Sequence, residues 1–209
     1  MKAHIQVFVF TLISIAVAEA QENRIGVKGG INFANFTGYQ QIGQQAKIGI
    51  NAGLLYELRL NDKISFQPEV LYSSQGTEYR INENQFKIFR KTNFSYINVP
   101  VVFRYYPIEF ISLEVGPQIG YLIEANEKID VDGESVSKAI ITDDYKTLDF
   151  SAVFGLTAHL KMGLFISGRY NLGLSLVDDK SFIVREENKI ISVMDRKNSV
   201  FQISVGYSL

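Results

Sequence analysis

Residues 93–126 contain two long runs in which apolar and polar side chains alternate, separated by a short turn at Pro107-Ile108-Glu109. Alternation over roughly a dozen residues exceeds the usual strand length of about 5–6 residues. Two such runs joined by a tight turn predict neighbouring antiparallel strands in the wall of a closed barrel. In the second run the apolar face holds Ile111, Leu113, Val115, Ile119, Tyr121 and Ile123, and the other face holds Ser112, Glu114, Gly116, Gln118, Gly120 and Glu124.

Composition excludes several classes of protein. The chain has 209 residues, of which 46% are hydrophobic and 21% are charged, so it is not a disordered chain. The formal net charge of −1 gives no support for nucleic-acid binding, which requires a clustered basic surface. Cysteine is absent, which excludes disulfides, zinc–thiolate sites and thiol nucleophiles.

The N-terminus has the pattern of a secretory signal peptide. A basic start at Met1-Lys2 precedes an apolar run over 5–18, and Ala18-Glu19-Ala20 supplies the small residues that precede cleavage. We expect a signal peptide over 1–20, cleaved between Ala20 and Gln21, followed by one barrel domain over 21–209. The alternative is a buried N-terminal helix, since the run is too short for a comfortable membrane-spanning helix.

The rest of the chain predicts an all-β fold, an eight-stranded antiparallel up-and-down transmembrane β-barrel. Short turns at 61–62, 107–108 and 162–163 alternate with longer polar connections near 37–44, 81–92, 126–145 and 179–196. An even number of strands with short turns at one rim and long loops at the other is typical of outer-membrane barrels, whose short turns are periplasmic. The expected strands are 24–36, 45–60, 63–80, 93–106, 109–125, 146–161, 163–178 and 197–209.

The polar face of these strands is expected to point into the lumen. A charge facing lipid at the midplane costs about 2–4 kcal/mol, whereas a charge in the lumen can find a partner. Eight strands leave a lumen that side chains fill. The alternative is a soluble exported ligand-binding barrel with the apolar face inside. The proposed lumen charge network consists of Lys28, Glu57, Glu69, Arg104, Glu114, His159 and Arg169.

Aromatic residues predict a girdle at each membrane interface. Tyr56, Tyr105 and Tyr207 fall near the short turns, and Phe94 and Tyr121 fall near the long connections.

Three prolines lie inside the expected strands, where each removes a hydrogen-bond donor. Pro68, Pro100 and Pro117 predict a slanted line of β-bulges that bends the wall, and a regular register through them would refute this.

The sequence gives little support for a catalytic function. His159, the one histidine after the signal peptide, lies near the short-turn rim, whereas a hydrolase acting on outer-leaflet lipid needs it at the other rim. Glu69 and Glu114 are candidates for acid–base work, but neighbouring arginines favour ion pairing. The segment Asp130-Val-Asp132-Gly133 faintly resembles a calcium loop, yet its twelfth position is Ile141 rather than Glu. We therefore expect no catalytic residue, no metal site and no cofactor.

Four segments together carry a resemblance to the PorT-family outer-membrane β-barrel domain, a resemblance that extends over nearly the whole mature chain. They are Ile25–Asn35 (IGVKGGINFAN), Phe66–Gly76 (FQPEVLYSSQG), Tyr96–Tyr106 (YINVPVVFRYY) and Leu113–Tyr121 (LEVGPQIGY). The resemblance implies an eight-stranded barrel in the outer membrane of a Gram-negative cell and defines no catalytic residues. One departure is the C-terminal Leu209, where many outer-membrane barrels end in an aromatic residue.

The sequence therefore predicts a non-enzymatic, structural or interacting barrel of the outer membrane. Its expected partners are outer-membrane lipid and an unknown protein or ligand at the extracellular loops, with no nucleic acid and one copy of the chain per barrel. The alternative functions are a narrow small-solute pore and the soluble ligand-binding barrel.

Overall fold

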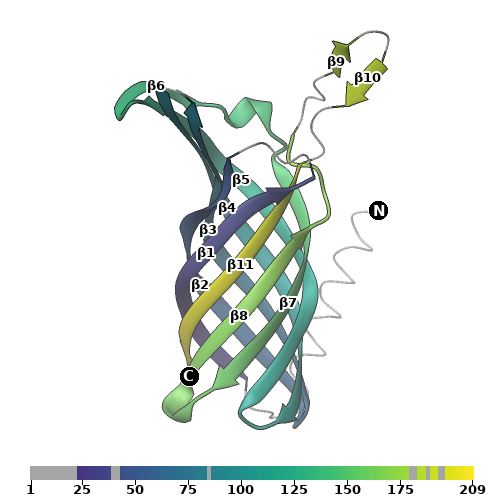
Figure 1. The fold of residues 1–209 in the computed structure, drawn as a ribbon. Helices are drawn as coiled ribbons and strands as arrows, with labels where there is room; N and C mark the ends of the chain where they lie inside the picture. The colour runs from purple at the N-terminus through teal and green to yellow at the C-terminus, as the bar shows by residue number, and fades with distance from the viewer. Residues whose placement is uncertain (1–22, 39–42, 84–85, 179–182, 187–188, 193–195) are drawn as a thin grey trace.

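Eight antiparallel strands form a closed ring in the computed structural model, which describes residues 23–38, 43–83, 86–178, 183–186, 189–192 and 196–209 (Figure 1). The predicted signal peptide lies outside the described residues. Around the ring the order is β1-β2-β3-β4-β5-β7-β8-β11, and β11 pairs with β1 to close it. The wall strands are β1 Arg24–Thr37, β2 Gln44–Asn61, β3 Ile64–Glu83, β4 Phe86–Ile108, β5 Ile111–Val131, β7 Leu148–His159, β8 Leu164–Gly173 and β11 Lys197–Ser208.

One rim carries the short connections and the other carries the long ones. At the short-connection rim β2 turns into β3, β4 into β5, and β7 into β8 through the 3₁₀ turn η2 (Lys161–Gly163), and β1 begins beside the end of β11. The remaining elements are β6 (Glu134–Ile140), the 3₁₀ turn η1 (Thr142–Asp144) and a separate hairpin of β9 (Ile183–Glu186) and β10 (Lys189–Ser192). In the described part of the chain, helical segments are too short and too polar to cross a membrane.

The two faces of each wall strand meet different surroundings. On β5, for example, Leu113, Val115 and Ile119 are about half exposed on the outside, while Glu114 and Gln118 are buried inside. On the other wall strands the outer side chains are likewise mostly aliphatic and aromatic, and the buried ones are mostly polar with some apolar side chains among them. The apolar face therefore points outward, and a soluble barrel with an apolar interior is excluded.

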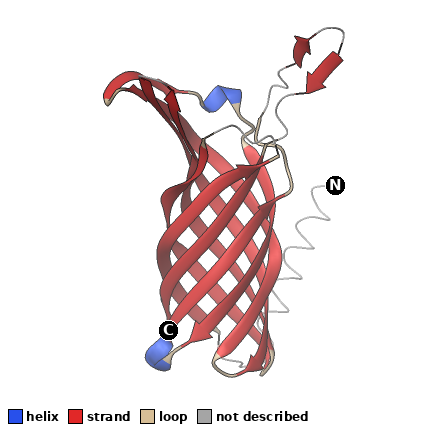
Figure 2. Cartoon of the chain, in the orientation of Figure 1, coloured by secondary structure: helices blue, strands red, loops and turns tan. Residues whose placement is uncertain are grey.

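Two segments predicted as loops, 81–92 and 126–145, are largely strand. β3, β4 and β5 continue past the rim, and β6 pairs with the extension of β5, which gives an open four-stranded sheet (Figure 2). We call residues 76–83, 86–93, 126–131 and 134–140 the projecting sheet. Outside the ring both sheet faces carry polar residues, so the alternation that predicted the wall strands fades there.

The acidic segment that resembles a calcium loop is a hairpin turn. Asp132 and Gly133 have positive φ angles of 53° and 90°, and they join β5 to β6. An Asp-Gly pair is a favoured sequence for such a two-residue turn, since both positions need φ above zero. The Asp132 carboxylate accepts a hydrogen bond from the backbone N–H of Lys87 at 2.8 Å.

The predicted line of bulges at the prolines is wrong. Pairing keeps one register from Ile64 to Glu83 across Pro68, from Tyr96 to Tyr105 across Pro100, and from Ile111 to Tyr121 across Pro117. The register shifts lie elsewhere, between Ala46 and Asn51, between Arg59 and Asn61, and between Ser95 and Tyr96 near the long-connection rim, among others. The wall therefore tolerates the missing N–H donor of each proline without a β-bulge at that position.

Of the five residues predicted for the aromatic girdles, four lie on the outer face of the barrel and one does not. Tyr56, Tyr105, Tyr207 and Tyr121 lie on the outer face, between 37% and 55% exposed. Phe94 is fully buried inside the barrel, so its assignment to a girdle is wrong. Phe94 is ten residues from the inward Arg104 on the same strand, and an even separation puts both on one face.

Candidate functional site in the lumen and at its outer end

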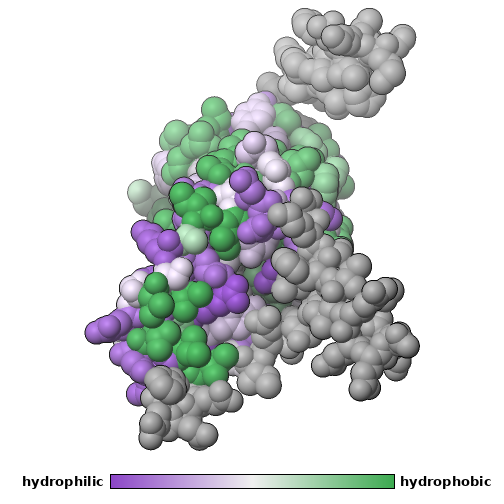
Figure 3. All heavy atoms as spheres, turned by 90° about the horizontal axis from the view of Figure 1, so that it is seen from above, coloured by the Kyte–Doolittle hydropathy of each residue, from purple (hydrophilic) through white to green (hydrophobic). Residues whose placement is uncertain are grey.

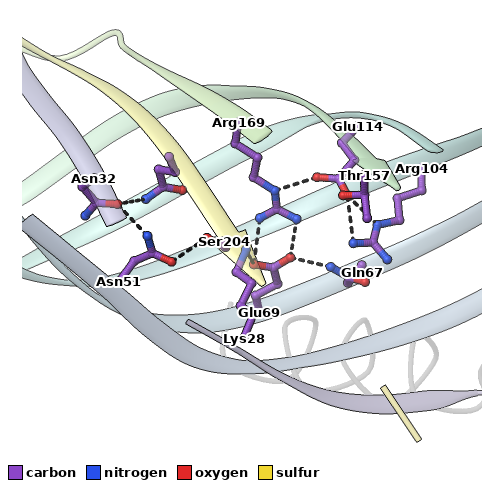
Figure 4. A network of polar contacts seen from close by, with 11 residues as sticks. Lys28, Asn32, Asn51, Gln67, Glu69, Arg104, Glu114, Thr157, Arg169 and Ser204 are labelled. Atoms are coloured by element: carbon purple, nitrogen blue, oxygen red, sulfur yellow. Dashed lines mark hydrogen bonds and ion pairs between the residues drawn. The ribbon is translucent and has the colours of Figure 1, made fainter. Parts of the chain in front are cut away.

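The centre of the lumen is crossed by an ion pair between opposite walls. Arg169 on β8 contacts Glu69 on β3 through two parallel hydrogen bonds, from Nη1 to Oε2 at 2.8 Å and from Nη2 to Oε1 at 2.7 Å (Figure 4). These strands are four positions apart in the eight-stranded ring, which is the largest separation available. Lys28 on β1 adds a third contact, from Nζ to Glu69 Oε2 at 2.6 Å.

A second carboxylate extends this pair toward the short-connection rim. Glu114 on β5 accepts hydrogen bonds from Arg169 Nε at 2.6 Å, from Arg104 Nε at 2.8 Å and from Thr157 Oγ1 at 2.6 Å. Arg104 also lies 3.5 Å from Glu57, measured from Nη1 to Oε2. The Tyr106 hydroxyl donates a hydrogen bond to Glu57. The six charged residues therefore form one continuous network.

The charges in this network balance. Lys28, Arg104 and Arg169 supply three positive charges, and Glu57, Glu69 and Glu114 supply three negative ones. All six residues are at most 5% exposed. Burying ions is expensive, and it is tolerated where each charge is paired and its remaining hydrogen-bonding groups are satisfied. Balance and bidentate geometry make this a mutually dependent set rather than six separate contacts.

A layer of amide and hydroxyl groups connects β1, β2, β3 and β11. The Asn32 side chain is its hub, since its Oδ1 accepts hydrogen bonds from Asn51 at 2.7 Å and from Gln202 at 3.0 Å. Its Nδ2 donates to the backbone carbonyls of Ile50 and Ser74. These two residues face each other where β2 and β3 lose their regular pairing, so Asn32 bridges an irregular part of the wall.

An apolar cluster closes the lumen at the long-connection rim. It is built from inward side chains of β1, β4 and β5 together with Val177 from the connection after β8. Phe94 lies at its centre, edge-on to Phe36 and to Tyr145. Figure 3 looks down on this end and shows apolar atoms among polar ones across the described residues. We call this set the apolar cap: Phe36, Phe94, Tyr96, Leu122, Ala125 and Val177, with Ile141 and Tyr145 packed against it.

An ion pair secures the outer connections to the apolar cap. Arg196 pairs with Asp178, and its guanidinium lies 5.3 Å from the ring centre of Phe36 and 5.8 Å from that of Tyr145. Neighbouring Asp178 raises the pKa of Arg196, against the opposing effect of burial. Backbone hydrogen bonds from Lys146 to Val177 and from Val177 to Arg196, both 2.9 Å, tie the same three segments together.

Of the seven residues predicted for the lumen, the structure brings six into the network and leaves one beside it. His159 makes no ion pair among the described residues. Its Nε2 lies 2.9 Å from Ser112 Oγ, and its ring packs near Tyr106 and Phe165 at the short-connection rim. The two carboxylates considered for acid–base work, Glu69 and Glu114, are both held by arginine.

Sequence reasoning missed several lumen residues that period-2 counting places on the correct face. Gln67 lies two residues before Glu69 and donates to it at 2.5 Å, and Asn32 lies four residues after Lys28. Phe94 and Tyr96 share the face of Arg104 in the same way. The partners across the lumen have no such signal, because the sequence of one strand does not specify which strand lies opposite.

A groove of about 620 Å³ lies at the outer rim, apart from the lumen network. Leu148 and Phe150, which line it, are about half exposed on the outer face of β7. The groove therefore opens toward the outside of the barrel. Its other lining residues are Thr142, Asp143, Tyr145, Lys146, Thr147 and Ser175.

A closed antiparallel ring with an apolar outside and a buried, paired polar inside is the architecture of a transmembrane β-barrel. Comparison with known families gives the same class: the family described as outer membrane protein β-barrel domain matches residues 19–179. The chain belongs to this family and is an outer-membrane β-barrel protein. The match covers the wall from β1 to β8, and β11 completes the ring by pairing with both.

The chain is also similar to several solved structures. Ail, the attachment invasion locus protein of Yersinia pestis, is 15% identical with a TM-score of 0.46, and the match covers 90% of this chain and all of that one. Neisserial surface protein A is 11% identical with a TM-score of 0.48, over 90% and 99% of the two chains. OprG from Pseudomonas aeruginosa is 10% identical with a TM-score of 0.41, over 90% and 97%. No curated protein sequence matches the chain.

Proposed function

We propose that this protein is a non-enzymatic, closed barrel that anchors the projecting sheet and the long connections outside the outer membrane of a Gram-negative cell. The side chains inside the lumen fill it and leave no path for solutes. Contacts with other molecules are made by the segments beyond the long-connection rim. The barrel acts as a single copy, delivered by the cleaved N-terminal signal peptide.

The observation that carries this proposal is the contact between Arg169 and Glu69. A bond between diametrically opposite strands leaves no room for a solute path along the axis at that level. A second crossing lies nearer the outer end, where Asn198 Nδ2 on β11 is 3.5 Å from the hydroxyl of Tyr96 on β4, again four strands away. The apolar cap adds a further barrier to ions.

The position of His159 supports a non-enzymatic role. A hydrolytic histidine that works on outer-leaflet lipid or on external peptide has to stand at the outer rim. His159 instead lies at the rim of the short connections, half-buried, packed against Tyr106 and hydrogen-bonded to Ser112.

The finer family assignment is part of the proposal. The four segments quoted above favour a barrel of the PorT type, within the broader family to which the chain belongs.

Ion conductance in planar lipid bilayers tests the closed lumen. Protein that shows heat-modifiable migration on a gel, the mark of a folded barrel, is reconstituted beside a general porin as a positive control. We expect the porin to conduct and this protein to give no steady current. A reproducible current step at each insertion would overturn the closed-lumen proposal and favour a narrow small-solute pore instead.

Membrane location is tested separately by cell fractionation. We expect the protein to remain with the outer membrane after carbonate extraction and to shift its gel migration on heating. Release by carbonate without a mobility shift would contradict insertion in the membrane.

A further inference from the structure

The outward face of the projecting sheet carries an unusual row of cations. Register pairs Glu78 of β3 with Lys91 of β4, Lys91 with Lys128 of β5, and Lys128 with Lys138 of β6. Three lysines therefore occupy neighbouring positions on three adjacent strands. Like charges placed directly opposite each other destabilise a sheet, so an anionic partner outside the sheet would stabilise this arrangement.

Contacts within the sheet confirm that these side chains share one face. Lys91 Nζ lies 3.0 Å from Glu78, and Lys128 Nζ lies 2.8 Å from Asp130, two residues along the same strand. In the next row Arg80 lies over the ring of Phe89 at 5.3 Å. Lys138 is exposed and has no ion-pair partner among the described residues.

The two rows have an excess of positive charge. Arg80, Lys91, Lys128 and Lys138 supply four positive charges, and Glu78 and Asp130 supply two negative ones, so the sum is +2. One further acid, Glu124, lies two rows nearer the apolar belt, where it accepts a hydrogen bond from Asn126. The opposite face of the sheet pairs Arg90 with Glu127 at 2.5 Å and has no comparable row among the side chains that the structure describes.

The position of the row relates it to the membrane surface. Ile123, 49% exposed, is the last outward apolar residue of β5 before the sheet leaves the wall. Lys128 follows five residues later, roughly 12 Å farther along the barrel axis for about 3.3 Å per residue and a strand tilt near 40°. The projecting sheet leans away from the barrel axis (Figure 1). Because a wall that bends outward turns its outer side toward the membrane, we infer that the outward face of the sheet is turned toward the membrane plane.

We propose that this face binds the phosphorylated headgroups of lipopolysaccharide in the outer leaflet. Lysine ammonium groups are point charges suited to phosphate. Exposed Ile140, in the adjoining row nearer the belt, gives the face an apolar contact for the lipid boundary. The proposal uses the orientation given above, with long connections outside, and is independent of whether the lumen conducts.

Binding of lipid A by the full-length protein in detergent micelles tests the proposal. The probes are fluorescent lipid A that carries its phosphates and the same lipid after removal of the phosphates. We expect the phosphorylated form to bind more tightly. Lys128→Gln/Lys138→Gln should weaken that binding about 30-fold, since each lysine near an anionic surface contributes a factor of about 5.

The matched control is Lys63→Gln/Lys161→Gln, which removes two charges from the short-connection rim and should leave binding unchanged. Heat-modifiable migration establishes that both variants are folded. Equal binding of the two lipids, or wild-type affinity in Lys128→Gln/Lys138→Gln, would overturn the proposal. Displacement of the lipid by millimolar inorganic phosphate would also overturn it, because the site would then be one for free anions. The micelle assay does not depend on orientation in the cell, so its failure is distinct from a failure of the proposed function.

Discussion

Arg169 and Glu69 are 100 residues apart in the sequence and are joined by two hydrogen bonds across the full width of the barrel. The same guanidinium reaches Glu114 with its third nitrogen at 2.6 Å. One arginine therefore links three strands that do not pair with one another, namely β8, β3 and β5. Without Arg169 the lumen network would divide into two separate parts.

Replacing Arg169 should be strongly destabilising. Arg169→Met leaves two buried carboxylates short of a partner, and breaking a buried pair in this way typically costs about 3–5 kcal/mol. Urea unfolding, followed by the fraction of heat-modifiable protein on gels, measures the loss. The matched control is Lys128→Met, which breaks an ion pair whose lysine is 49% exposed, and it should cost at most about 1 kcal/mol. Similar losses in both variants would contradict the central place of Arg169.

Truncation of the apolar cap should cost more than truncation of the outer surface. Phe94→Ala opens a cavity at a fully buried site and should lose about 3–5 kcal/mol. Phe154→Ala changes an outward phenylalanine that is 49% exposed, where lipid fills the space that the ring leaves. The same unfolding assay in lipid vesicles compares them. A Phe154→Ala loss equal to that of Phe94→Ala would argue that the cap is not a packed core.

The loss of stability caused by a charge on the outer face should depend on how deep in the membrane the charge lies. Ile119→Arg puts a cation near the middle of the apolar face of β5 and should destabilise the inserted barrel by about 2–4 kcal/mol. Ile123→Arg lies close to the outer boundary and should cost about 0–1 kcal/mol. Folding into bilayers at increasing urea concentration gives both values. Equal costs at the two depths would be inconsistent with lipid around this strand.

Alkaline pH should loosen the apolar cap. Burial raises the pKa of Tyr145 above its ordinary value of about 10. A group with a raised folded-state pKa contributes stability that is present below the unfolded pKa and lost as pH rises through the folded one. The thermal midpoint of the wild type should therefore fall faster than that of Tyr145→Phe as pH increases above about 10. Parallel curves for the two proteins would show that the Tyr145 hydroxyl is not buried in the cap.

The wall of the barrel was predictable because lipid and lumen impose opposite demands on neighbouring residues. Leu113 and Glu114 show this contrast side by side, and the pattern fixes both the strand and its faces. Beyond the rim the contrast disappears: Arg90 and Lys91 are neighbours on opposite faces and both are charged. The pattern therefore predicts loops for the projecting sheet, although the pair Asp132-Gly133 is itself a hairpin signal.

The lumen site was predictable as a set of residues and not as a set of contacts. Period-2 counting places Lys28, Glu69 and Arg169 inside. Which of them meet depends on the stagger of eight strands, and that stagger is set by tertiary pairing. The same limit applies to the register shift beside Ser95, for which the local sequence has no Gly or Pro signal.

The pairing of β1 with β11 has a consequence for biogenesis. These strands pair along nearly their whole length, from Gly26 opposite Ser208 at one end to Thr37 opposite Lys197 at the other. One edge of β1, the first strand to be synthesised, therefore stays unpaired until β11, the last strand, has been made. An unpaired strand edge is a template for aggregation. Contacts of such long sequence separation also make folding slow. The finished wall is continuous, but the unfinished chain has two open edges, and it needs protection during its passage to the membrane.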